Sequence, residues 1–122
     1  MIKVLIIEDE PLIAKMYQKA LDQKEYEVTL SVGGGDEGFE LAKTLNPNLI
    51  LLDLMMPDPD GIEILKRLKA EVSTKEIPVV VLTNLSGRHD EAFARSLGAL
   101  DYWVKDDIEL EELGKKIKEV LQ

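Results

Sequence analysis

The chain contains no cysteine, which excludes disulfide bonds, thiol catalysis and zinc–thiolate sites and fits a cytoplasmic protein. It also has no apolar run close to the about 20 residues that a bilayer-spanning helix requires, so we expect no insertion into a membrane. The N-terminal stretch MIKVLIIEDE is a short apolar run followed at once by acidic residues. It therefore predicts a first strand and not a signal peptide.

Basic residues are also in the minority, because 15 Lys and Arg stand against 24 Asp and Glu and leave a net charge of −9. Proteins that bind nucleic acid contact its phosphates with Lys and Arg, so we expect no direct nucleic-acid binding. The acidity is compatible with a bound divalent cation, but also with simple solubility. At 122 residues, the chain is expected to form one domain with one hydrophobic core, spanning residues 1–122.

Apolar runs and helical periodicity alternate regularly along the chain. The predicted strands cover residues 3–7, 26–32, 49–53, 79–82 and 99–104. Apolar residues at helical spacing cover 11–21, 36–45, 62–72 and 110–121, and a short helix is expected around 92–97. Five strand–helix units in this order predict an α/β fold, in which a doubly wound, five-stranded parallel sheet carries helices on both faces.

Local signals mark several of the expected helix ends. Glu10 stands just before Pro11, which suits the first turn of a helix, so we expect the acid to act as a cap. Asp36 is a candidate N-cap for the second helix, and Gly98 a candidate C-cap for the fourth. His89, the only histidine, is expected in a loop and is given no role.

Polar residues occur where four of the five predicted strands end. These residues are Glu8 and Asp9, Asp53, Thr83, and Lys105. Each taken alone has an ordinary structural explanation, such as helix capping or a turn. Together they favour a site, because the carboxyl ends of parallel strands lie at one edge of the sheet, where ligands bind.

Charge balance indicates what this edge could hold. If the first and third strands are neighbours, three carboxylates crowd together, and like charges about 4 Å apart repel by about 4 kcal/mol at an effective dielectric of about 20. Three carboxylates and one lysine leave a charge of about −2, which one divalent ion balances. Hard oxygen ligands of this kind favour Mg²⁺.

Four motifs now stand out: VLIIEDE, LLDLMMPDPDG, VLT and DYWVK. With these motifs in this order and spacing, the sequence resembles a response regulator receiver domain across essentially its whole length. The resemblance implies a flavodoxin-like fold with strand order 2-1-3-4-5. The single-domain chemotaxis-regulator type is the most similar, since the chain ends with its fifth helix.

The resemblance also implies a metal site and a phosphoacceptor. Asp53 would accept a phosphoryl group from a histidine kinase or a histidine phosphotransfer protein. Asp9 and Asp53 would bind Mg²⁺ directly, Glu8 would bind it through water, and Met55 would contribute its backbone carbonyl.

Further residues would bind the phosphoryl group and transmit the signal. Lys105 would offset its charge, while the Thr83 hydroxyl and the backbone of Asn84 would hydrogen-bond it. As Thr83 moves, Tyr102 would turn inward, and the surface formed by the fourth helix, fifth strand and fifth helix would change its affinity for a downstream protein. The resemblance thus implies a switch that catalyses its own phosphotransfer and dephosphorylation, not a stand-alone enzyme.

The sequence departs from the family pattern at several positions. Asp106 replaces the usual proline, and a cis bond without proline costs about 3–4 kcal/mol, so we expect a trans bond or a rearranged loop after Lys105. Asn84 is larger than the usual residue, which predicts slow phosphorylation by small donors. Stabilisation by the dipole of the last helix explains the acids of 106–112. A more specific alternative is that they bind a basic partner. Trp103 either adds apolar surface near the output face or shields the sheet edge.

Three other classes of α/β protein share some of these features. A phosphatase of the haloacid dehalogenase type would need a second acid where Met55 stands. A flavodoxin would need a phosphate-binding first loop, whereas Glu8, Asp9 and Glu10 repel phosphate. A receiver-like scaffold that binds partners without phosphorylation stays open because of Asn84 and Asp106.

Overall fold

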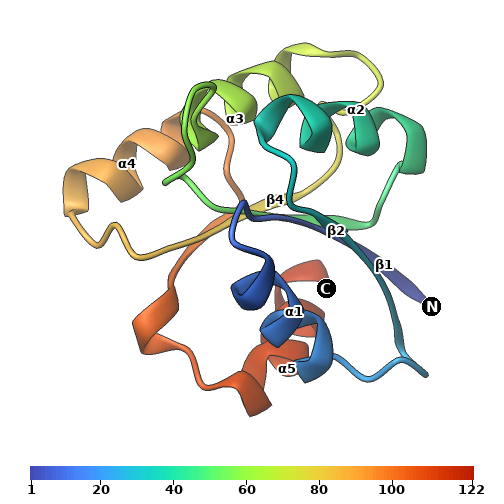
Figure 1. The fold of residues 1–122 in the computed structure, drawn as a ribbon. Helices are drawn as coiled ribbons and strands as arrows, with labels where there is room; N and C mark the ends of the chain where they lie inside the picture. The colour runs from blue at the N-terminus through green and yellow to red at the C-terminus, as the bar shows by residue number, and fades with distance from the viewer.

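A computed structural model describes residues 1–122 as a five-stranded parallel sheet with helices on both faces (Figure 1). The strand order is β2-β1-β3-β4-β5, which confirms the predicted fold class. The strands are β1 Ile2–Ile7, β2 Tyr26–Ser31, β3 Leu49–Leu52, β4 Val79–Thr83 and β5 Asp101–Val104. The helices are α1 Pro11–Ala20, α2 Gly35–Leu45, α3 Gly61–Ala70, α4 Arg88–Ser96 and α5 Leu113–Leu121. No helix is both long enough and apolar enough to span a bilayer.

The sheet separates two apolar layers, which explains the unbroken apolar runs in its central strands. Ile7 and Leu52 pack on the side of α2, α3 and α4, whereas Ile6 and Leu51 pack on the side of α1 and α5. Figure 1 shows these two sets of helices on opposite faces of the sheet. Successive residues of a strand point to opposite faces, so a strand buried on both sides needs apolar residues at every position.

Helix α3 ends earlier than the sequence predicted. Strands β2 and β5 are also shorter, since β2 ends at Ser31 and β5 begins at Asp101. The third helix was expected to include Val72, but it ends at Ala70 and the Val72 side chain is 79% exposed. The chain turns there because the Thr74 hydroxyl donates to the Leu68 carbonyl at 2.7 Å and closes the end of the helix. Periodicity alone continued through Val72 because it cannot detect this turn.

Two of the expected helix caps are wrong. Glu10 lies at the N-cap position of α1, but its side chain caps nothing. Helix α2 begins at Gly35 after Gly34, whose φ of 104° favours glycine, and the Asp36 carboxylate instead pairs with Arg67 of α3. The expected C-cap is confirmed, since Gly98 follows α4 with a φ of 111°.

The segment before the last helix and the start of α4 also differ from expectation. Two short 3₁₀ turns, Lys105–Asp107 and Leu110–Glu112, precede α5, and the first turn of α5 contains no acid. The acids of 106–112 therefore precede the first turn of α5, and only Glu112, at its N-cap position, directly adjoins the positive end of the helix dipole. His89 lies in the first turn of α4 and not in a loop.

The close approach of Gly61 to the chain after β3 yields a stability prediction. A Cβ atom at Gly61 would lie 2.3 Å from the Asp53 carbonyl oxygen and 2.5 Å from the Leu54 Cα. Because backbone atoms cannot move aside, we expect Gly61→Ala to lower the free energy of unfolding by about 1–3 kcal/mol in urea titrations.

Gly114→Ala is the matched control, since its Cβ would approach only the Tyr26 side chain, with the hydroxyl at 3.3 Å and the nearest ring carbon at 3.5 Å. Alanine is favoured over glycine inside a helix, so the control should unfold at the same or a higher urea concentration. Equal stabilities for the two variants would contradict the prediction.

Candidate functional site

The acids after β1 and β3 meet because these strands are neighbours in the sheet. Ile7 pairs with Leu52, and the Asp53 amide donates to the Ile7 carbonyl at 3.1 Å. As a result, one carboxylate oxygen from each of Glu8, Asp9 and Asp53 lies within 4.8 Å of the others. The acid cluster expected from the sequence is confirmed.

Lys105 brings the one positive charge to this cluster from the end of β5. Its Nζ donates to Glu8 Oε1 and, at 3.0 Å, to Asp53 Oδ2. The side chains are only 11% exposed for Lys105, 3% for Glu8 and 6% for Asp53, so water screens these charges little. The second oxygen of Glu8 accepts from the Glu10 amide at 3.1 Å, so both carboxylate oxygens of Glu8 have a partner.

Burial and pairing shift the titration of these groups. Burial is the strongest influence on Glu8 and raises the pKa of its carboxyl, although Lys105 and the Glu10 amide act against it. Burial disfavours the charged form of Lys105, but its hydrogen bonds to Glu8 and Asp53 outweigh that influence and raise the pKa of the ammonium. Lys105 therefore stays charged at neutral pH.

The loop after β3 is arranged around Asp53. Its Oδ1 accepts from the Met55 amide at 3.0 Å, so both carboxylate oxygens have a partner. The Met55 side chain points outward and is 56% exposed. Met55 therefore contacts Asp53 through its backbone, consistent with a role that does not depend on its side chain.

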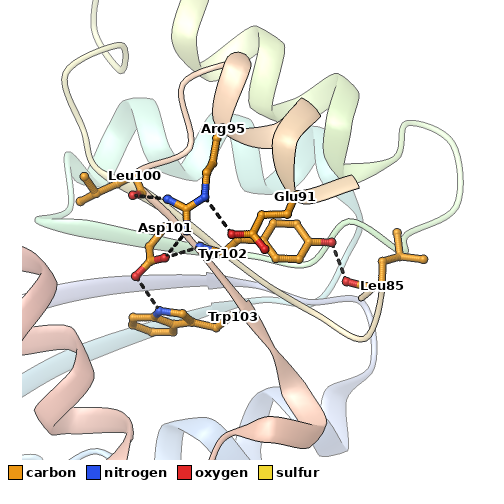
Figure 2. Close-up of polar contacts among 7 residues, drawn as sticks. All are labelled: Leu85, Glu91, Arg95, Leu100, Asp101, Tyr102 and Trp103. Carbon is orange, nitrogen blue, oxygen red and sulfur yellow. Dashed lines mark hydrogen bonds and ion pairs between the residues drawn. The ribbon is translucent and has the colours of Figure 1, made fainter. Parts of the chain in front are cut away.

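Thr83 lies at the end of β4, next to β3 in the sheet, and is fully buried. Its hydroxyl accepts from the Leu85 amide at 3.5 Å, while the neighbouring Asn84 is exposed. Tyr102 of β5 already lies inward against the α2–α4 side of the core and donates its hydroxyl proton to the Leu85 carbonyl at 2.6 Å (Figure 2). The inward turn expected of Tyr102 on phosphorylation is therefore not supported, because this side chain is only 7% exposed before any phosphoryl group is attached. Thr83 and Tyr102 thus contact the same residue of the β4–α4 loop.

The end of β5 has a trans backbone and a buried tryptophan. The sole cis peptide bond is Asp58–Pro59, so the bond after Lys105 is trans, as predicted, and a 3₁₀ turn begins there. Trp103 is only 6% exposed and packs on the α1–α5 side of the core. It shields the sheet, and the alternative that it adds exposed apolar surface is wrong.

Two residues, Tyr17 and Asp101, make contacts that the sequence did not predict. Tyr17 of α1 is 4% exposed and lines the space beside Glu8 and Asp53, and burial raises the pKa of its phenol. Asp101 accepts hydrogen bonds from three different residues, as described below. Helical spacing marked Tyr17 only as a core position, and Asp101 was the first residue of the DYWVK motif without being given a role.

Fold and site together define a doubly wound α/β domain whose carboxyl edge holds three acids and one buried lysine. The family model of the response regulator receiver domain matches residues 4–118. The chain therefore belongs to this family and is a receiver domain of two-component response regulators.

Individual relatives agree with this assignment. Response regulator ArlR of Staphylococcus haemolyticus is 37% identical over 122 residues, which is 100% of this chain and 53% of ArlR. Chemotaxis protein CheY4 of Vibrio cholerae has a TM-score of 0.88 at 28% identity, covering 98% of both chains. The Mn(2+)-bound form of response regulator Rcp1 has a TM-score of 0.78 at 28% identity, covering 98% of this chain and 91% of that one. The chain spans about half the length of the curated relatives it matches.

The buried Tyr102 phenol predicts how stability changes at alkaline pH. Burial, and next the charges of nearby carboxylates, raise the pKa of Tyr102 to about 12. An unfolded tyrosine titrates near pH ~10, so the folded state holds this proton more tightly. The stabilisation is fully present below about pH 10 and is lost as the pH rises to about 12.

We therefore expect the free energy of unfolding to fall less steeply between these pH values in Tyr102→Phe than in the wild type. Denaturant titrations at a series of pH values measure this difference. Parallel curves for the two proteins would contradict the assignment of the shifted pKa to Tyr102.

Proposed function

We propose that this domain is a phosphorylation-dependent switch, in which Asp53 accepts a phosphoryl group and the α4-β5-α5 face then changes its affinity for a downstream protein. The donor would be a phosphohistidine on a histidine kinase or a histidine phosphotransfer protein in the cytoplasm. The domain would promote its own phosphotransfer and dephosphorylation without being a stand-alone enzyme. The observation that carries the proposal is the Lys105 ammonium, held between Glu8 and Asp53 at the carboxyl edge of the sheet.

In the transfer step, an Asp53 carboxylate oxygen attacks phosphorus and forms the P–O bond of an acyl phosphate. The P–N bond to the donor imidazole breaks, and its electron pair stays with the imidazole. Lys105, 3.0 Å from Asp53 Oδ2, is already placed to offset negative charge on the phosphoryl oxygens. The Met55 amide holds the other carboxylate oxygen and orients the nucleophile.

The residues present fit a magnesium ion. Carboxylate oxygens of Glu8, Asp9 and Asp53 lie within 4.8 Å of one another, and oxygen is the ligand that Mg²⁺ prefers. Asp9 and Asp53 would hold the ion directly, the Met55 carbonyl would add a ligand, and Glu8, engaged with Lys105, would act through water. When bound, the ion supplies charge neutralisation for the transferring phosphoryl group. The Mn(2+)-bound form of Rcp1 supports a divalent-cation site in this family.

The output step would begin at the loop after β4. The Thr83 hydroxyl and the Asn84 backbone would hydrogen-bond the attached phosphoryl group, which carries about two negative charges. Thr83 would then release the Leu85 amide, its present 3.5 Å partner. The Leu85 carbonyl accepts from Tyr102 of β5. Movement of Leu85 would therefore change the contacts of Tyr102 and, through them, the α4-β5-α5 face.

Beryllofluoride with Mg²⁺, a stand-in for the phosphoryl group, tests the proposal. We expect saturable changes in Trp103 fluorescence and in the backbone NMR shifts of Thr83 and Leu85. Asp53→Asn should abolish these changes, whereas Asp58→Asn, which alters an acid of the same loop outside the cluster, should keep them. An unresponsive wild type, or a response that survives Asp53→Asn, would remove the switch and leave the scaffold alternative.

Asn84 is proposed to limit access of small phosphodonors to Asp53. We expect Asn84→Ala to accelerate phosphorylation by acetyl phosphate about threefold or more, which is about 0.6 kcal/mol in activation free energy. Intact-protein mass spectrometry over time measures the rate. Ser86→Ala, an exposed position two residues further along the loop, is the control and should leave the rate unchanged. No acceleration in Asn84→Ala would refute the role.

A further inference from the structure

Helix α4 is held by less apolar burial than its neighbour on the same face of the sheet. Of its nine residues only Ala94 is buried, whereas α3 buries Gly61, Ile64, Leu65 and Leu68. Packing of an apolar face supplies most of the stability of helices in proteins. Polar contacts therefore carry a larger share of what holds α4 in place.

Two polar contacts attach α4 and the loop before it to β5, one on each side of the helix. Near the start of the helix, Tyr102 donates to the Leu85 carbonyl, in the loop that leads into Arg88 (Figure 2). Near the end, the Arg95 guanidinium reaches β5, where its Nη2 donates to Asp101 Oδ1 at 2.8 Å. The proposed switch acts on the first contact through Thr83, but it has no described link to the second.

Arg95 is well oriented for this contact. Its Nε donates to Glu91 Oε2 at 2.9 Å, one turn earlier on the same helix, and its Nη1 donates to the Leu100 carbonyl at 3.4 Å. Figure 2 shows the guanidinium between the helix and the strand, with these partners around it. Several partners fix the orientation of the planar guanidinium better than one ion pair would.

The Asp101 carboxylate joins both sides of the sheet edge. Its Oδ1 also accepts from the Tyr102 amide at 2.8 Å, and its Oδ2 accepts from Trp103 Nε1 at 3.0 Å. Trp103 packs on the opposite side of the sheet, and Lys116 of α5 lies 5.3 Å above its ring. Burial acts against the charged form of Asp101, but the hydrogen bonds from Tyr102, Trp103 and Arg95 outweigh it and lower the pKa of the carboxyl.

We propose that Asp101 is a positioning residue whose contact with Arg95 holds the C-terminal end of α4 on β5 and thereby opposes activation of the switch. The inference rests on the proposed function. A ligand that favours a rearranged α4-β5-α5 face shifts the equilibrium only by its differential affinity for the two arrangements. A contact that stabilises the resting arrangement must therefore weaken the apparent affinity for that ligand.

Beryllofluoride titrations of variants test this positioning role. In Arg95→Gln and in Asp101→Asn, the half-saturating beryllofluoride concentration should fall about two- to fivefold, the effect expected of a partly exposed ion pair. The double variant should show no larger decrease than either single variant, because both remove the same contact. NMR shifts of Thr83 and Leu85 are the readout, since Asp101→Asn alters the surroundings of Trp103 directly.

The chain offers a matched control on the other helix pair. Arg67 of α3 likewise contacts a glutamate one turn earlier, Glu63, and an acid of a different element, Asp36. Arg67→Gln should lower stability to a similar degree without changing the half-saturating concentration. An unchanged concentration in both Asp101→Asn and Arg95→Gln, or an equal decrease in Arg67→Gln, would overturn the proposal.

Amide hydrogen exchange of the unmodified protein separates this inference from the proposed function. Asp101→Asn should speed exchange across α4 and leave α3 unchanged, whether or not beryllofluoride binds. Unchanged exchange in α4 would refute the positioning role. A wild type that does not respond to beryllofluoride would refute the switch, and with it the claim that the contact opposes activation.

Discussion

The contact of one buried ammonium with two buried carboxylates is the interaction on which this structure depends. Charges that leave water need partners, and removing one partner of such a set leaves an uncompensated buried charge. Lys105, Glu8 and Asp53 satisfy one another, but with Asp9 nearby the negative charges still outnumber the positive. A site that holds excess negative charge with little contact with water is suited to binding a cation. It is also suited to a reaction in which charge is transferred to one of its carboxylates.

The sheet provides the rigid support for this cluster. The central strands β1, β3 and β4 are apolar at nearly every position, because helices cover both of their faces. The acids follow β1 and β3, Thr83 is the last residue of β4, and Lys105 follows the edge strand β5, so packed strands position these backbones. The side chains of the acids and of Lys105 extend from the segments after the strands, where binding groups are commonly found.

Apolar burial decreases from the central strands of the sheet toward α4. The β4–α4 loop contacts Thr83 on one side and Tyr102 on the other, through the amide and the carbonyl of the same residue, Leu85. Helix α4 beyond it has one buried residue and is joined to β5 by the contact of Arg95 with Asp101. A helix held largely by polar contacts can change position when a few of them change, which a helix with a large apolar face cannot do without exposing its core.

The sequence by itself determined the alternation of strands and helices and the residues at the strand ends. Unbroken apolar runs and helical periodicity are local properties of the chain, and they predict whether a segment forms a strand or a helix. Strand order and the roles of Asp53, Asp9 and Lys105 came from resemblance to a family, because local pattern does not specify which strands become neighbours. Helix ends were the weakest part, as Val72 and Asp36 show, since tertiary contacts decide where a turn stops.

Only the tertiary structure decided which polar groups satisfy one another. Lys105 and Glu8 are 97 positions apart, and the Tyr102 hydroxyl and its acceptor on Leu85 are 17 apart. The sequence placed Asp101 in the DYWVK motif, but only packing brought Arg95 and the Trp103 indole to its two oxygens. Such contacts depend on how the sheet and helices pack together, and a periodicity that extends over a few turns carries no information about that packing.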